Sequence, residues 1–85
     1  MITMHMNVKI KLFSHLKYKL HAEYISIEVS DQATIAEVRI KIREFGGSGI
    51  ADIPYRVAVG SKFVDDSFKI GPDDIVALIP PVQGG

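Results

Sequence analysis

The spacing of apolar residues differs between segments of this 85-residue chain, and these differences limit the folds open to it. Residues 7–13 and 24–29 alternate apolar with polar residues, which is the period of a half-buried β-strand. Residues 34–45 instead repeat apolar residues every three or four positions, which predicts a helix with one apolar stripe. The stripe consists of Ile35, Val38, Ile42 and Phe45. The first half of the chain is therefore predicted as strand, strand, helix.

Both ends of the predicted helix carry local signals. Thr34 followed by Glu37 fits a capping box, in which each side chain satisfies the other residue's backbone N–H in the first turn. Gly46-Gly47 ends the helix, because glycine adopts left-handed backbone angles without steric cost. We expect a loop over residues 48–54, and we assign neither helix nor strand to residues 14–23.

The second half of the chain predicts three more strands, over residues 55–59, 62–64 and 75–79. Gly60-Ser61 suits a two-residue hairpin turn. The last strand is apolar throughout, which favours a central position in the sheet, and it ends at Pro80. We therefore predict one α+β domain over residues 1–85, a mixed sheet with one main helix on one face. We expect residues 79–85 to form a flexible tail.

Composition excludes several classes of function. Ten Lys plus Arg balance ten Asp plus Glu, so no net field attracts nucleic acid or an anionic membrane. The chain has no cysteine, which excludes disulfides, thiolate metal sites and a cysteine nucleophile. His5, His15 and His21 lack the spacing of metal ligands, so no metal site is expected. No apolar run reaches the roughly 18 residues that span a bilayer, and we expect a cytoplasmic location.

Two sets of charged residues have a structural interpretation. Asp65-Asp66 and Asp73-Asp74 lie beside turn residues, where aspartate commonly bonds to the nearby backbone. A locally basic strip surrounds the first strand, and we expect it to be a solvated face. The strip consists of Lys9, Lys11, Lys17 and Lys19.

The sequence ends in Pro80-Pro81-Val82-Gln83-Gly84-Gly85. We expect the stiff Pro-Pro step to hold two residues without side chains away from the folded body, as suits insertion into a narrow site of another protein. These six residues reach at most about 20 Å when extended. We expect the Gly85 carboxylate to be the reactive group, because a Cβ at position 85 would crowd an attacking nucleophile and one at Gly84 would widen the thread.

Three segments of the sequence resemble the ubiquitin-like β-grasp sulfur carriers. They are this tail, the preceding Ile75-Val76-Ala77-Leu78-Ile79 and the helix start Thr34-Ile35-Ala36-Glu37-Val38. Within that group the sequence is most similar to the small subunit of molybdopterin synthase. The resemblance implies the β-grasp fold and a role as carrier. The chain would bind no cofactor and would catalyse nothing by itself.

The resemblance also implies a cycle of partners. An ATP-dependent, E1-like activating enzyme would adenylate the Gly85 carboxylate, and a sulfur donor protein would convert the acyl adenylate to a thiocarboxylate. The tail would then enter the large subunit of molybdopterin synthase and deliver sulfur to the pterin precursor of the molybdenum cofactor.

Strand alternation predicts where these partners dock. If Val8, Ile10 and Leu12 face the helix, then Phe13 faces the other way, and so does Ile79 in the last strand. Phe63 of the hairpin is a third candidate for the same exposed apolar patch. We predict that this patch and the tail residues bind the large subunit and the activating enzyme. The tail residues are Pro80, Pro81, Val82 and Gln83.

Three other interpretations remain open from the sequence. Gly85 could be joined to lysines of target proteins, as in a ubiquitin-like modifier, because the same acyl adenylate serves both reactions. The sulfur could instead serve thiamine, cysteine or another metabolite. The chain could also be a plain ubiquitin-like interaction domain, in which the terminal glycines have no chemical role.

Overall fold

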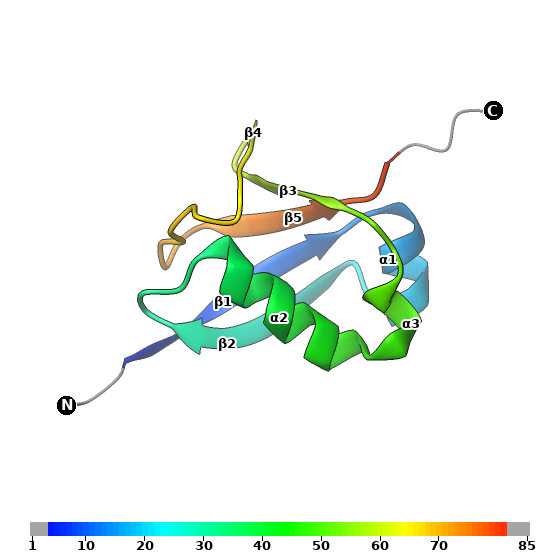
Figure 1. The fold of residues 1–85 in the computed structure, drawn as a ribbon, viewed down its shortest axis with the longest axis horizontal. Helices are drawn as coiled ribbons and strands as arrows, with labels where there is room; N and C mark the ends of the chain where they lie inside the picture. Colours follow the sequence, from blue (N-terminus) through cyan, green and yellow to red (C-terminus); the bar gives the residue numbers. More distant parts are fainter. Residues whose placement is uncertain (1–3, 82–85) are drawn as a thin grey trace.

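The structure is a computed structural model that describes residues 4–81 (Figure 1). Its elements, in chain order, are β1 (His5–Leu12), α1 (Ser14–Leu20), β2 (Tyr24–Ser30), α2 (Ile35–Gly46), α3 (Ser48–Ala51), β3 (Arg56–Val59), β4 (Lys62–Phe63) and β5 (Ile75–Ile79). The strands form one sheet in the order β2-β1-β5-β3-β4, and α2 lies across one of its faces.

The pairing of the strands confirms the predicted mixed sheet. β1 pairs antiparallel with β2 and parallel with β5, while β3 pairs antiparallel with both β5 and β4. β5 is thus flanked by β1 and β3, as its continuous apolar run predicted. The parallel pair joins segments from the two ends of the described chain.

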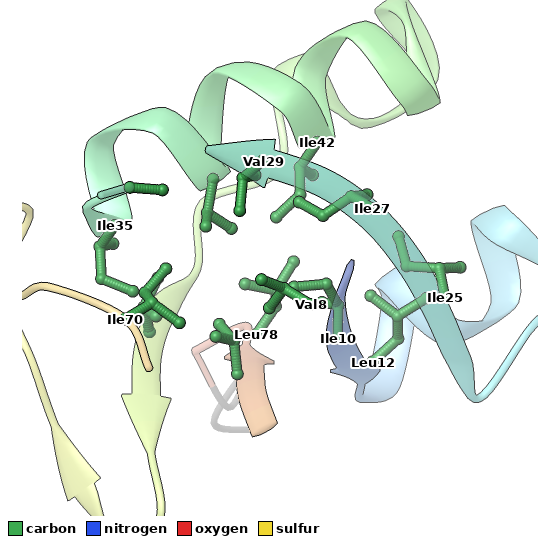
Figure 2. Packing of buried hydrophobic residues seen from close by; sticks show 14 of the residues in the cluster. Val8, Ile10, Leu12, Ile25, Ile27, Val29, Ile35, Ile42, Ile70 and Leu78 are labelled. Carbon is green, nitrogen blue, oxygen red and sulfur yellow. The ribbon is translucent and has the colours of Figure 1, made fainter. Parts of the chain in front are cut away.

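The core lies between α2 and the sheet (Figure 2). β1 contributes Val8, Ile10 and Leu12, which are at most 1 % exposed. Alternate residues of β2 and β5 and one side of α2 add most of the remaining core residues. These further residues are Ile25, Ile27, Val29, Ile35, Val38, Ile42, Val76 and Leu78. Because β1, β2 and β5 bury every second side chain, the same register that builds this core also fixes which side chains the other face displays.

The start of α2 differs from the predicted capping box. Within residues 4–81, the Thr34 side chain makes no capping hydrogen bond, although Thr34 occupies the N-cap position. The Glu37 carboxylate instead accepts a bond of 3.1 Å from the backbone N–H of Ser30, the last residue of β2. Glu37 therefore ties the helix to the edge strand of the sheet.

Backbone carbonyls from a distant segment cap the helix in place of Thr34. The N–H of Ile35 donates to the carbonyl of Phe68 at 3.0 Å, and that of Ala36 donates to Asp66 at 3.1 Å. These N–H groups have no partner within the helix itself. The connection between β4 and β5 thus supplies the cap, a contact that sequence spacing alone does not show.

Two helices were not predicted. Residues 14–23, which we assigned to neither helix nor strand, contain α1. This helix buries a single residue, Leu16, and so gives no repeating apolar signal. α1 is bounded by the left-handed residues Ser14 and His21, both with φ of 54°. Part of the predicted loop over residues 48–54 forms the one-turn helix α3.

The apolar stripe of α2 also ends earlier than predicted. Phe45 is 55 % exposed, so its expected place in the core was wrong. Gly46 is packed instead against Ile50 of α3, which is 3 % exposed and belongs to the core. A Cβ on Gly46 would overlap Cδ1 of Ile50. The predicted Gly46-Gly47 stop is confirmed, and Gly47 ends α2 with φ of 62°.

The contact between Gly46 and Ile50 makes a testable difference between two glycines. Gly46→Ala should lower the free energy of unfolding by about 1–3 kcal/mol, because Ile50 must move from its packed position. Gly49→Ala should change it by no more than about 0.5 kcal/mol, since nothing lies within 4 Å of a Cβ there. Urea unfolding of both variants measures the difference. Equal stability of the two would contradict the packing at Gly46.

Candidate docking site on the open face of the sheet

The sheet face opposite α2 carries exposed and half-buried side chains, and we call it the open face. Strand register places Tyr24, Lys11, Ala77, Ala58 and Phe63 in one row across all five strands. Paired residues of neighbouring strands project to the same side of a sheet. One row of the open face therefore has aromatic rings at its two ends and alanines near its centre.

This sequence of large and small side chains creates a hollow of about 450 Å³, which we call the open-face hollow. Its lining residues are Lys11, Phe13, Tyr24, Ala58, Gly60, Ser61, Phe63, Ile75, Ala77 and Ile79. The structure thus brings together Phe13, Phe63 and Ile79, the three residues predicted to form an exposed apolar patch. Phe13 is 36 % exposed and Phe63 is 51 % exposed.

A tight turn places Phe63 at the hollow. Gly60 has φ of 64°, a backbone angle that side chains disfavour, and the hairpin returns directly into β4. Phe63 then pairs with Ala58 of β3. The predicted hairpin at Gly60-Ser61 is confirmed. Because this hairpin joins the short strands β3 and β4, it holds the exposed Phe63 ring beside the sheet.

Three cations surround the hollow, each above an aromatic ring. Lys9 Nζ lies 4.3 Å from the centroid of the Tyr24 ring, and Lys11 Nζ lies 5.1 Å from that of Phe13. The guanidinium carbon of Arg56 lies 3.7 Å from the centroid of Phe63. Such contacts hold a cation in place while one side of it stays in water.

Sequence reasoning missed most of this arrangement. Lys9 and Lys11 were interpreted only as part of a solvated strip, and Lys11 in fact lines the hollow. Lys17 and Lys19 belong to α1, so the strip does not form one face. The sequence did not identify five other residues as part of a docking surface, namely Tyr24, Arg56, Ile75 and the two central alanines. Only the pairing of β1 with β2, and of β5 with β1 and β3, would have revealed them.

The tail begins beside the hollow. Ile79, which lines it, is the last residue of β5, and Pro80 follows with a buried side chain while Pro81 is exposed. Of the two prolines, Pro81 is therefore the one open to a partner. The predicted tail positions Val82, Gln83, Gly84 and Gly85 lie outside the described residues.

The acidic turns are only partly as predicted. Asp65 accepts hydrogen bonds from the Ser67 hydroxyl and N–H, which lower the pKa of its carboxyl, and Asp74 accepts one from the N–H of Gly71. Asp66 instead pairs with Arg39 of α2 at 2.7 Å. Its role as a turn residue was therefore incomplete.

A second, smaller pocket of about 220 Å³ lies beside α2, away from the open face. Arg39, Arg43 and Tyr55 line it above a floor that includes Ile42 and Ile50. Burial raises the pKa of Tyr55, and the neighbouring Arg39 opposes that shift. Among residues 4–81 no three His, Cys, Asp or Glu side chains group as metal ligands, and no helix there is long and apolar enough to cross a membrane.

Comparison with known proteins assigns the chain to a family, because the ThiS family profile matches residues 10–85. The chain belongs to the ThiS family. Its members are small sulfur carriers and related modifiers that are not catalysts on their own. This chain is therefore a ThiS-like sulfur carrier or a ubiquitin-like modifier.

Solved structures with low sequence identity share the fold. SAMP1 of Haloferax volcanii, a small archaeal modifier protein, has a TM-score of 0.82 at 18 % identity over 93 % of this chain and 99 % of its own. A chain of the complex of subunits 1 and 2 of the molybdopterin-converting factor from Helicobacter pylori 26695 has a TM-score of 0.69 at 23 % identity. The match covers 94 % of this chain and 100 % of that one.

Ubiquitin of Caldiarchaeum subterraneum has a TM-score of 0.63 at 21 % identity, over 95 % of this chain and 99 % of its own. The predicted ubiquitin-like β-grasp fold is confirmed. At these identities the likeness concerns the fold alone.

Adjacent residues at the end of β1 test the assignment of the two faces. Leu12→Asp should unfold the domain or destabilise it by more than about 4 kcal/mol, because Leu12 is 1 % exposed in the core. Phe13→Asp should keep the fold and cost about 1 kcal/mol or less, since Phe13 lies at the rim of the hollow. Circular dichroism and urea unfolding compare the two. A Phe13→Asp variant as damaged as Leu12→Asp would place Phe13 in the core.

Proposed function

We propose that this protein is the sulfur-carrying small subunit of a molybdopterin synthase. The observation that carries the proposal is an apolar hollow on a ThiS-family β-grasp domain, placed where β5 leads into the Pro80-Pro81 step and the Gly84-Gly85 end. The likeness in fold to a chain of the Helicobacter pylori molybdopterin-converting factor complex supports the choice of pathway.

The reaction takes place at the Gly85 carboxylate. A carboxylate is a poor electrophile, so an E1-like activating enzyme first joins it to AMP from ATP and releases pyrophosphate. The terminal sulfur of a persulfide on the donor protein then attacks the carbonyl carbon, and AMP leaves, so the carrier and the donor are joined through an acyl disulfide. A cysteine thiol of a partner protein attacks the donor-side sulfur of that S–S bond, which forms a new disulfide and releases Gly85 with the outer sulfur. The product is a thiocarboxylate, and the chain itself supplies no catalytic group. ATP belongs to the activating enzyme, and the chain binds no cofactor in this scheme.

The folded body provides the docking energy that the tail lacks. Ordering the four residues after Pro81 costs on the order of 1–2 kcal/mol for each residue. The two glycines have almost no apolar area to offset this cost. Burying the Phe13, Phe63 and Ile79 side chains in a partner stabilises the complex by roughly 1.5–3 kcal/mol for each fully buried side chain. The two totals are comparable, so the hollow is the natural contact for the large subunit and the activating enzyme.

The likeness to SAMP1 of Haloferax volcanii favours a second candidate, a protein modifier. In that case the acyl adenylate of Gly85 passes to lysines of target proteins and forms isopeptide bonds. Conjugates that appear as larger species in the cell and vanish when Gly85 is deleted would support the modifier. A carrier for thiamine, cysteine or another metabolite would give the thiocarboxylate without restoring molybdenum-enzyme activity.

The intact mass of the purified protein tests the carrier chemistry. After expression in a host with sulfur-activating enzymes, the mass should rise by the difference between one sulfur and one oxygen atom. The increase should depend on ATP and disappear in a Gly85 deletion. A chain that keeps its unmodified mass when incubated with the activating enzyme, ATP and the sulfur donor of its own organism would contradict the proposal.

Binding measurements test the docking site separately. Phe13→Asp should weaken binding to the molybdopterin synthase large subunit about tenfold to a hundredfold, the loss of one buried anchor. Phe45→Asp is the matched control, because Phe45 is 55 % exposed on α2, over the other face of the sheet. Its affinity should equal that of the wild type. Equal effects of the two substitutions would remove the hollow as the docking site.

A further inference from the structure

The cations around the open-face hollow are not neutralised by the protein itself. Within residues 4–81, Lys9, Lys11 and Arg56 form no ion pair, and none of the residues that line the hollow is acidic. Glu28 lies farther along β2, where His5 Nδ1 approaches it at 3.7 Å. The hollow is therefore locally basic on a chain whose net charge is zero.

Strand register explains this separation of charge. Lys9 pairs with Ile75 and Lys11 with Ala77 of β5, which places both ammonium groups on the open face. Arg56 pairs with Ile79 from the opposite side of β5. Four of the ten acidic residues instead occupy the connection between β4 and β5. These are Asp65, Asp66, Asp73 and Asp74.

The aromatic rings orient these cations so that they can bind carboxylates. A guanidinium that stacks on a ring keeps its N–H edge free for the two oxygens of a carboxylate. A cation already held above a ring also loses less conformational freedom when it binds. The lining of the hollow includes the small side chains of Ala58 and Ala77 and the apolar side chains of Ile75 and Ile79. The surface thus combines an apolar depression with fixed positive charges.

We propose that the open-face hollow binds an apolar side chain of a partner protein that is flanked by carboxylates. This inference rests on the proposed function, in which the activating enzyme and the large subunit both dock here. It implies that each of these partners presents an apolar side chain flanked by carboxylates. The apolar side chain fills the depression, while carboxylates pair with Arg56 on one side and with Lys9 or Lys11 on the other. Attraction between the opposite charges also speeds association.

A nucleic acid fits the surface less well. Proteins that bind single strands stack bases on open aromatic faces. Here the faces of Tyr24, Phe13 and Phe63 are already occupied by the chain's own cations. The zero net charge likewise gives no long-range attraction for phosphates.

The test measures the affinity of the full chain for the ATP-dependent activating enzyme of the same organism at two salt concentrations. Lys11→Glu and Arg56→Glu should each weaken binding about tenfold at 0.1 M salt. At 1 M salt, where the screening length falls from about 10 Å to about 3 Å, the difference from the wild type should shrink to about twofold. Lys41→Glu on α2 is the control with the same change of charge, and its affinity should stay within about twofold.

Arg56→Gln provides a second variant in case the reversed charge disturbs the sheet, and circular dichroism verifies the fold of each variant. Phe13→Asp could weaken binding while the charge variants bind as tightly as the wild type at both salt concentrations. Docking would then be purely apolar. That result would contradict this inference but leave the proposed function standing. Binding of a single-stranded oligonucleotide that is lost in the same charge variants would also overturn it. If the wild type binds neither the activating enzyme nor the large subunit, the proposed function fails and the inference with it.

Discussion

The parallel ladder between β1 and β5 is the interaction on which the rest of the structure depends. It pairs Lys9 to Leu12, near the start of the chain, with Ile75 to Leu78, near its end. Closing so long a loop has an entropic cost, which the core side chains of both strands offset as they pack beneath α2. The same ladder sets Lys11 beside Ala77 on the open face. One register therefore builds the core, the hollow and the start of the tail.

Much of this fold could be predicted from the sequence, because its main elements carry strong periodic signals. Residue spacing directly reflects which side chains must pack in the core. This holds for the alternation in residues 7–13 and 24–29 and for the stripe from Ile35 to Ile42. α1 escaped prediction because only Leu16 anchors it, and one buried residue defines no period. The cap of α2 escaped because it comes from the carbonyls of Phe68 and Asp66, some thirty residues away. Thr34 and Glu37 gave the right position for the helix start but the wrong hydrogen bonds.

The candidate site was predictable in part for a related reason. Strand parity correctly turned Phe13 and Ile79 away from the helix, since parity needs only a strand and a known inward residue. It could not show that Arg56 and Lys11 would stand on either side of the hollow, because that depends on which strands are neighbours. The lining of the hollow is equally a product of pairing, as two alanines meet only when β3 lies beside β5.

In the proposed function, the folded domain is a docking module and the Gly85 carboxylate is the group that partner enzymes activate. The most direct test is a variant extended by one tryptophan beyond Gly85, with mass spectrometry to show that it is not trimmed. It should still bind the activating enzyme through the open face, but it should form no thiocarboxylate and restore no molybdopterin synthesis in cells that lack the original protein. Full restoration by the untrimmed variant would contradict the central claim.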